Sequence, residues 1–230
     1  MKQAPVRVLV IGAKGRMGRT IVDLAKGEPN VEVAAQCDLG DAIAPAMKNA
    51  DMAIDFSQPG AIEEICRAAT EDSKPLVIGT TGHSTEQREL IQKTARAVPI
   101  VFASNFSVGV NALFALTRRA GEILRDFDVS IVETHHKTKK DAPSGTAKTL
   151  AQIAKSTRKI DSEVPIESMR EGEVVGEHTV VFVGPAERLE LTHRAGSREI
   201  FGRGALRAAQ WVVGKPAGLY SMQDVLGLGL

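Results

Sequence analysis

Short apolar runs alternate with longer amphipathic segments over the first hundred residues. The short runs are apolar almost throughout, which is typical of parallel strands covered on both faces. The longer segments have the periodicity of helices. Strands are predicted at 6–12, 31–38, 52–57, 75–82 and 99–105, and helices at 15–26, 61–70 and 84–97.

The helix predicted at 84–97 carries its own start signal. Ser84 is followed three residues later by Gln87, the spacing of a capping box. Strand and helix alternating at this rhythm predict right-handed crossovers and an α/β fold with a Rossmann-type doubly wound parallel sheet. Such sheets bind ligands beyond the carboxyl ends of their strands, and here those ends are rich in glycine, hydroxyl and small residues.

The pattern changes after Phe106. A long apolar-periodic segment at 108–124 precedes a strand at 128–136 and a helix at 144–157, and strands at 164–170, 177–184 and 187–195 then alternate apolar with polar residues. Such alternation indicates an antiparallel or mixed sheet with one solvated face. A helix at 204–214 and a short helical turn at 222–226 end the chain.

These elements predict two domains. Residues 1–105 form a dinucleotide-binding domain, and residues 106–198 form a second α+β domain with a mixed open sheet. We expect the C-terminal segment, 199–230, to return to the first domain.

Composition is typical of a soluble globular protein and limits the possible partners. Of 230 residues, 43% are hydrophobic and 25% charged, and the formal net charge of +1 gives no general reason to expect nucleic acid as a partner. With no run of about 18 apolar residues and no signal-peptide pattern, we expect a cytoplasmic protein without a membrane partner. Cys37 and Cys66 lack metal or redox spacing and are expected to be buried thiols.

The first chemical motif is GAKGRMG, from Gly12 to Gly18, between a predicted strand and a predicted helix. Glycines there let the backbone approach a pyrophosphate, and the helix start attracts its charge. The spacing is GxxGxxG instead of GxGxxG, but Asp38 lies 20 residues after Gly18, where an acid can bind a ribose 2′-hydroxyl. The predicted ligand is therefore NAD(H) or NADP(H).

The choice between the two dinucleotides depends on the residues that meet the 2′ position. Asp38 would repel a 2′-phosphate and Leu39 offers no positive charge, which favours NADH. Lys14 and Arg16 keep NADPH open as an alternative.

The second motif is ETHHKTKKDAPSGTA, residues 133–147. A metal site is not expected, because His135 and His136 are adjacent on a strand end, where neighbours point to opposite sides, and no further ligand motif accompanies them. Ser144 lacks the GxSxG context of a nucleophile and is expected to cap a helix. The Ser-Gly-Thr helix start suits a carboxylate, and a histidine with nearby lysines can supply a proton, so the segment suits reduction of a small dicarboxylate.

This second motif closely resembles the E-x-HH-xx-K-x-DAPSGTA signature of the 4-hydroxy-tetrahydrodipicolinate reductase (dihydrodipicolinate reductase) family. The segments VIGAKGRMG, DFS, VIGTTG, ASNFSVGVN and GLYSMQDVLGL also resemble that family, in the family's order, so the resemblance covers essentially the whole chain. It implies reduction of (4S)-4-hydroxy-2,3,4,5-tetrahydrodipicolinate to tetrahydrodipicolinate and water with NADH or NADPH, in lysine biosynthesis through diaminopimelate. It also implies a homotetramer assembled through the sheet of the second domain.

The resemblance assigns roles to individual residues. His135 and Lys139 are implied as catalytic, and which of them releases the proton stays open. The residues implied in substrate binding are His136, Lys139, Ser144, Gly145 and Thr146. The residues implied in cofactor binding are Gly12, Ala13, Lys14, Gly15, Arg16, Met17, Asp38, Gly79, Thr80, Thr81, Ala103, Ser104, Asn105 and Phe106.

Two other classes remain as alternatives. One is a different two-domain Rossmann dehydrogenase acting on a small carboxylate; a semialdehyde dehydrogenase would need a catalytic cysteine, and neither cysteine lies near the second-domain loop. The other is a non-catalytic dinucleotide sensor, which would have little use for the histidines and lysines of the second motif. Lys137 and Lys140 have no assigned role and are interpreted as solvated neighbours.

Overall fold

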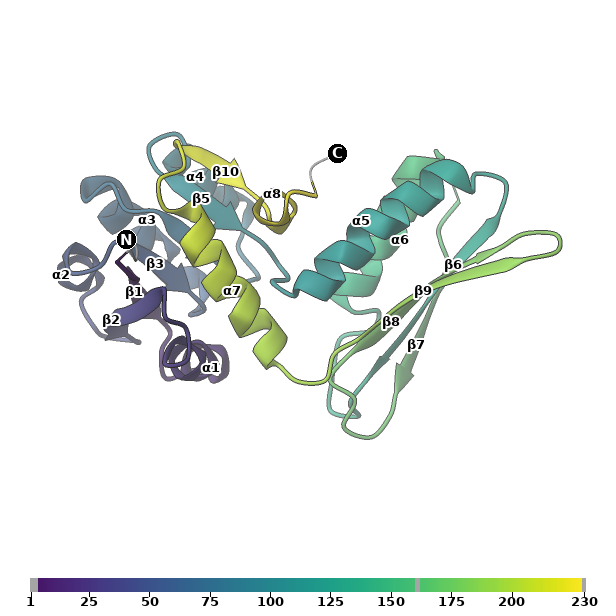
Figure 1. Ribbon diagram of the computed structural model, residues 1–230, viewed down its shortest axis with the longest axis horizontal. Helices are drawn as coiled ribbons and strands as arrows, with labels where there is room; N and C mark the ends of the chain where they lie inside the picture. The colour runs from purple at the N-terminus through teal and green to yellow at the C-terminus, as the bar shows by residue number, and fades with distance from the viewer. Residues whose placement is uncertain (1–3, 160–161, 229–230) are drawn as a thin grey trace. The chain divides into compact units, whose positions relative to one another are not determined.

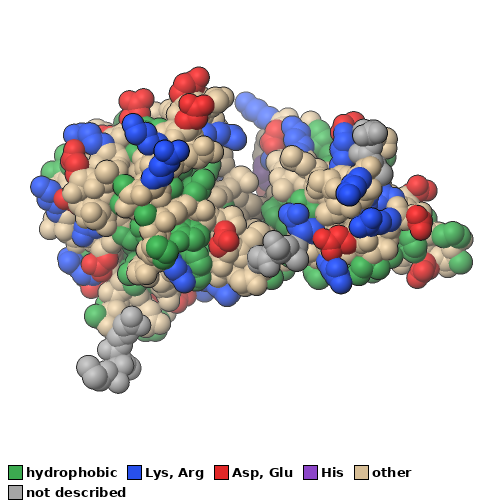
Figure 2. All heavy atoms as spheres, turned by 90° about the horizontal axis from the view of Figure 1, so that it is seen from above, with side chains coloured by type: hydrophobic (Ala, Val, Ile, Leu, Met, Phe, Trp, Pro, Cys, Tyr) green, Lys and Arg blue, Asp and Glu red, His purple; other side chains and the backbone are tan. Residues whose placement is uncertain are grey.

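The computed structural model describes residues 4–159 and 162–228. The chain divides into two compact units, one made of residues 1–107 together with 199–230 and the other of residues 108–198 (Figure 1). We call them the first and the second unit. On the face drawn in Figure 2, acidic and basic side chains are interspersed on both units.

The first unit contains a six-stranded sheet in which every paired strand is parallel. In spatial order the strands are β10 (Gly218–Tyr220), β5 (Pro99–Phe102), β4 (Leu76–Ile78), β3 (Met52–Asp55), β1 (Val6–Ile11) and β2 (Val31–Cys37). The Rossmann-type sheet predicted from the alternating pattern is confirmed. The short strand β10 was not predicted from the sequence.

Helices cover both faces of this sheet. Alternate residues of β1 show why, because Val8 and Val10 pack in one apolar cluster while Leu9 and Ile11 pack in the other. The cluster of Val8 includes residues of α1 (Arg16–Ala25), α7 (Glu199–Val212) and α8 (Met222–Leu226). The cluster of Leu9 includes residues of α2 (Ile43–Lys48), α3 (Ile62–Glu71) and α4 (Thr85–Thr94), and a 3-10 turn, Pro59–Ala61, precedes α3.

Local signals explain several of these boundaries. The Ser84 side chain accepts a hydrogen bond from the N–H of Gln87, and the Gln87 side chain accepts one from the N–H of Ser84, so the predicted capping box is confirmed. Helix α2 was not predicted, because six residues that include a proline give too short an apolar period. Cys37 and Cys66 are buried free thiols, as expected.

The second unit is a mixed four-stranded sheet with helices on one face. The strand order is β7 (Ile166–Arg170), β6 (Asp128–His135), β8 (Glu177–Val183) and β9 (Arg188–Arg194), with β6 parallel to β7 and the other pairs antiparallel. The apolar side chains of α5 (Val108–Ile123) and α6 (Gly145–Arg158) pack with alternate strand residues such as Ile131 and Val180. The predicted mixed sheet is confirmed.

The same alternation places the polar site residues. Glu133 and His135 follow Ile131 at steps of two, so they continue the helix-facing side of β6. Residues of the other face include Met169 and Val183, which are 40% and 41% exposed. None of the helices in the described ranges is both long and apolar enough to cross a membrane.

Candidate active site

The glycine loop between β1 and α1 lies against the end of β3. Gly12 has φ +80°, and a Cβ on it would lie 2.5 Å from the backbone oxygen of Phe56, so only glycine fits there. A Cβ on Gly18 would likewise come within 2.1 Å of the Gly12 oxygen. Helix α1 begins after Gly15, and within the described chain no side chain caps it and no acid lies in its first turn. The helix start therefore offers backbone N–H groups to an anion.

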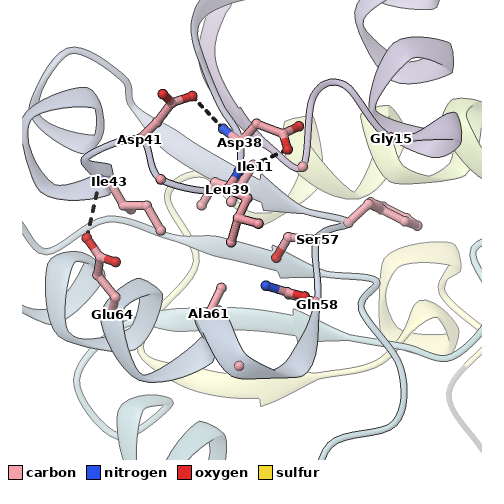
Figure 3. A pocket seen from close by; sticks show the side chains of 14 residues that line it. Ile11, Gly15, Asp38, Leu39, Asp41, Ile43, Ser57, Gln58, Ala61 and Glu64 are labelled. Carbon is pink, nitrogen blue, oxygen red and sulfur yellow. Dashed lines mark hydrogen bonds between the residues drawn. The ribbon is translucent and has the colours of Figure 1, made fainter.

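A cavity of about 430 Å³ opens beside this loop (Figure 3). Its lining includes Gly12 and Gly15 of the loop, Asp38, Leu39 and Asp41 after β2, and Glu64 of α3. We call it the glycine-loop cavity. Its polar wall is acidic, and Leu39, which is 83% exposed, offers an apolar surface.

Hydrogen bonds hold Asp38 in the wall of this cavity. Its Oδ2 accepts a hydrogen bond from the N–H of Lys14 at 2.7 Å and its Oδ1 accepts one from the N–H of Leu39 at 2.9 Å, while its own N–H donates to Asp41 Oδ2 at 2.8 Å. The N–H groups of Leu39 and Lys14 lower the pKa of Asp38 from its ordinary value. The carboxylate is therefore charged at neutral pH, as the hydrogen-bonding role predicted for it requires.

A second cavity, of about 210 Å³, brings together Thr80, Thr81, Ala103 and Ser104, four of the residues implied in cofactor binding. It lies at the ends of β4 and β5, and His83 also lines it. Gly79 is adjacent, and a Cβ there would lie 2.2 Å from the Phe56 ring.

The remaining residues implied in cofactor binding take varied positions. Lys14 and Arg16 are exposed, Met17 is half-buried and Ala13 is buried. Phe106 is a core residue whose ring centroid lies 5.6 Å from that of Phe56. The side-chain oxygen of Asn105 accepts a hydrogen bond from the N–H of Ser107 at 2.9 Å.

The second unit builds a separate polar cluster around Glu133, whose side chain is 0% exposed. Its Oε1 accepts hydrogen bonds from Arg170 Nη2 at 3.0 Å and from the N–H of Ser144 at 3.2 Å. Its Oε2 lies 2.5 Å from Nδ1 of His135. Ser144 Oγ lies 3.1 Å from Nε2 of His178. We call these five residues the Glu133 network.

Burial and charge set the protonation of this network. Burial alone would raise the pKa of Glu133, but hydrogen bonds from Ser168, Arg170 and Ser144 lower it below its ordinary value. Burial lowers the pKa of His135, with Glu133 opposing that shift. Burial also lowers the pKa of His178 to about 4, so this ring is neutral at neutral pH. The His135 and His178 rings meet edge to face, with centroids 5.1 Å apart.

The loop between β6 and α6 carries the other residues of the second motif. Lys139 Nζ donates to Asp141 Oδ1 at 2.7 Å, and this bond is the main cause that lowers the pKa of Asp141. Arg170 Nη2 also donates to the backbone oxygen of Asp141, at 2.6 Å. His136 is half-buried, with its Nδ1 2.8 Å from Thr138 Oγ1. Arg170 therefore ties the loop to the same carboxylate that contacts His135.

Ser144 caps α6 and is itself buried. Its Oγ accepts a hydrogen bond from the N–H of Ala147 at 3.2 Å, as the sequence predicts for a helix cap. Both its N–H and its hydroxyl have partners within the chain. Gly145 is exposed, and a Cβ built on it meets open space. Lys137 and Lys140 are also exposed, as interpreted from the sequence.

Sequence reasoning missed three members of the Glu133 network as functional candidates: Glu133, Arg170 and His178. The spacing of Glu133 and His135, two residues apart on one strand, was a usable signal. Arg170 and His178 gave none, because only the register places Arg170 opposite His135 and His178 opposite Glu133. Ligand atoms of Glu133, His135 and His178 lie within 4.8 Å of one another, but the guanidinium of Arg170 already occupies the carboxylate. We therefore interpret the cluster as a hydrogen-bonded network and not as a metal centre.

Comparisons with known proteins agree along the whole chain. Residues 6–106 match the family model described as dihydrodipicolinate reductase, N-terminus, and residues 109–226 match the one described as dihydrodipicolinate reductase, C-terminus. A 4-hydroxy-tetrahydrodipicolinate reductase from Akkermansia muciniphila is 46% identical, with 97% of this chain and 98% of that protein covered. One from Aquifex aeolicus is 41% identical, with 97% and 99% covered.

A solved structure shares the fold. The dipicolinate-bound dihydrodipicolinate reductase from Paenisporosarcina sp. TG-14 superimposes with a TM-score of 0.84 at 22% identity, covering 96% of this chain and 98% of that one. With a Rossmann-type unit, a mixed-sheet unit and family matches over both, this chain belongs to the dihydrodipicolinate reductase family of oxidoreductases.

Proposed function

We propose that this chain reduces 4-hydroxy-tetrahydrodipicolinate to tetrahydrodipicolinate and water, with NADH or NADPH, in the diaminopimelate route to lysine. The observation that carries the proposal is the family match over both units together with the second motif, whose His135 and Lys139 lie in and beside the Glu133 network. The reaction consumes one hydride and one proton. The cytoplasm is the compartment that we propose for it.

The glycine loop fits a dinucleotide. The close approach of Gly12 to β3 and the uncapped start of α1 leave room and N–H groups for a pyrophosphate, so Gly12 to Met17 would hold it. When bound, the nicotinamide ring supplies the hydride. Gly79 to Thr81 and Ala103 to Phe106, around the second cavity, are the residues that we propose for the nicotinamide half.

NADH is the proposed preference. Asp38, Asp41 and Glu64 make the polar wall of the glycine-loop cavity acidic, and a 2′-phosphate there would meet like charge. If NADPH binds, the exposed Lys14 and Arg16 of the glycine loop would be the residues that contact its 2′-phosphate.

The proton is proposed to come from His135 or Lys139. His135 is a buried ring with a fixed carboxylate partner, whereas Lys139 is a cation bound to the exposed Asp141. Substrate carboxylates are assigned to His136, Lys139, Gly145 and Thr146, where the start of α6 attracts negative charge. Ser144 contributes by capping that helix.

A homotetramer is the proposed assembly. On the face of the second unit's sheet opposite α5 and α6, Met169 and Val183 are 40% and 41% exposed, beside polar residues such as Thr179 and Thr192. Exposed apolar residues on a sheet face are suited to burial against another copy.

The test is direct. Freshly made hydroxy-tetrahydrodipicolinate is added to the purified protein together with NADH or NADPH, in separate reactions. The absorbance of the reduced nicotinamide, which is lost on oxidation, is followed in each. Substrate-dependent oxidation is expected, faster with NADH. Oxidation of neither dinucleotide would overturn the proposal.

A further inference from the structure

Glu133 is a buried carboxylate that the proposed substrate and cofactor contacts do not use. A charged group with a fully enclosed side chain is costly to bury unless partners satisfy it. Its partners come from three elements: Arg170 from β7, Ser144 from the start of α6, and His135 from its own strand. Three separate elements therefore supply groups that keep this buried carboxylate in one position.

The two oxygens of Glu133 have different partners. Oε1 accepts hydrogen bonds from Arg170 and from the N–H of Ser144, which leaves Oε2 directed at Nδ1 of His135. A carboxylate oxygen can only accept, so this contact favours the ring with its proton on Nδ1. The other ring nitrogen, Nε2, faces Gly176, where a Cβ would lie only 3.1 Å from it. Gly176 thus keeps the Nε2 edge uncrowded.

We propose that Glu133 is a positioning residue that fixes His135 in the Nδ1–H tautomer and stabilises its protonated form, so that the proton given to the substrate leaves from Nε2. The imidazolium then becomes the neutral Nδ1–H ring and regains its Nε2 proton from solvent, while Glu133 stays ionised throughout. This inference rests on the proposed function, because it makes His135 the proton donor of that reduction.

The surroundings of His135 lower its pKa overall, and Glu133 opposes that shift. Burial lowers its pKa, Lys139 of the loop and Arg170 of β7 lower it further, and Glu133 raises it. The ring of His178 on β8 contacts that of His135, and His178 is paired across the sheet with His193 on β9. Burial lowers the pKa of His178 to about 4, so this ring is neutral. Among the charged groups described around the ring, Glu133 is therefore the one that favours the protonated form.

Replacement of Glu133 by glutamine keeps one side-chain oxygen and exchanges the other for an NH₂ group. The single amide oxygen can still accept from Arg170 and Ser144, which turns the amide NH₂ toward Nδ1 of His135. That amide donates, so Nδ1 must now accept and the ring proton moves to Nε2. Glu187→Gln is the matched control, because Glu187 is an exposed acid of the same unit, in the turn between β8 and β9.

The experiment records ¹⁵N spectra of histidine-labelled protein and the pH dependence of kcat for the wild type, Glu133→Gln and Glu187→Gln. We expect His135 as Nδ1–H in the wild type and as Nε2–H in Glu133→Gln, with its pKa lower by roughly one unit or more. The kcat of Glu133→Gln is expected to fall about tenfold or more, with its high-pH limb shifted to lower pH, while KM and dinucleotide affinity stay within roughly threefold. Glu187→Gln should match the wild type.

A wild-type His135 in the Nε2–H form would overturn the proposal, and that measurement stands even if Glu133→Gln fails to fold. An unchanged tautomer or an unchanged pH profile in a folded Glu133→Gln would overturn it as well. The spectra need no substrate. A wild type that shows the Nδ1–H form but reduces no hydroxy-tetrahydrodipicolinate would therefore contradict the proposed function and the catalytic use of His135, while leaving the tautomer assignment in place.

Discussion

The glycine-loop cavity and the Glu133 network are both polar sites, but they are built in different ways. The cavity wall comes largely from loops that follow strands of one parallel sheet. Backbone N–H groups fix its side chains, as those of Lys14 and Leu39 do for the Asp38 carboxylate. The Glu133 network joins side chains of three strands and a helix start, and they bond mainly to one another. A site of the first kind depends on backbone shape, and one of the second kind depends on strand register.

The largest expected effect comes from removing the proton donors of the second unit. If His135 or Lys139 is the general acid, His135→Gln or Lys139→Ala should lower kcat by roughly a hundredfold or more. Loss of a substrate contact alone would appear instead as a raised KM with kcat retained. Steady-state kinetics of both variants decides between these roles, and near-normal kcat in both would contradict the assignment.

A backbone change should break the cavity without touching the network. Gly12→Ala places a Cβ 2.5 Å from the Phe56 oxygen at φ +80°, whereas Gly214→Ala has a similar φ of +79° but open space around it. Both are strained by φ, so their difference isolates the close approach, which we expect to lower the free energy of unfolding by about 1–3 kcal/mol. Urea unfolding of the two variants measures it. Equal midpoints would show that the close approach is unimportant.

Adding one methyl group should likewise disturb the Glu133 network. Gly176→Ala puts a methyl group 3.1 Å from His135 Nε2, so either the ring shifts or Nε2 loses its free edge. We expect kcat to fall about tenfold, because small displacements of a reacting group are costly. Gly196→Ala, in open space, is the control and should be near wild type. A Gly176→Ala enzyme with the same kcat as Gly196→Ala would indicate that Nε2 needs no free edge.

The smallest expected effect concerns cofactor choice. Asp38→Asn removes a negative charge from the glycine-loop cavity but keeps an oxygen that can accept from the N–H of Lys14 or Leu39. The ratio of kcat/KM for NADPH to that for NADH should rise about three- to tenfold, since an exposed charge contributes modestly. A ratio that does not rise would place the 2′ position away from Asp38.

The two regions also differ in how far the sequence predicts them. The strand-to-helix turn of Gly12 to Gly18 and the Ser84 capping box are local patterns, and the structure has both. The mixed sheet followed from alternation along single strands, which also puts Glu133 and His135 on one face. The pairing of β6 with β7 and β8 did not follow, because register is fixed by packing between distant segments. That is why Arg170 and His178 could not be found from their own neighbours in sequence.

In the proposed reaction, a hydride passes directly from the nicotinamide of NADH to the ring of hydroxy-tetrahydrodipicolinate. The most direct test of this transfer uses NADH carrying deuterium at both C4 positions of the nicotinamide, with mass spectrometry of the tetrahydrodipicolinate formed. We expect one deuterium in the product for each NADH oxidised. A product without deuterium, or oxidation without product, would contradict it.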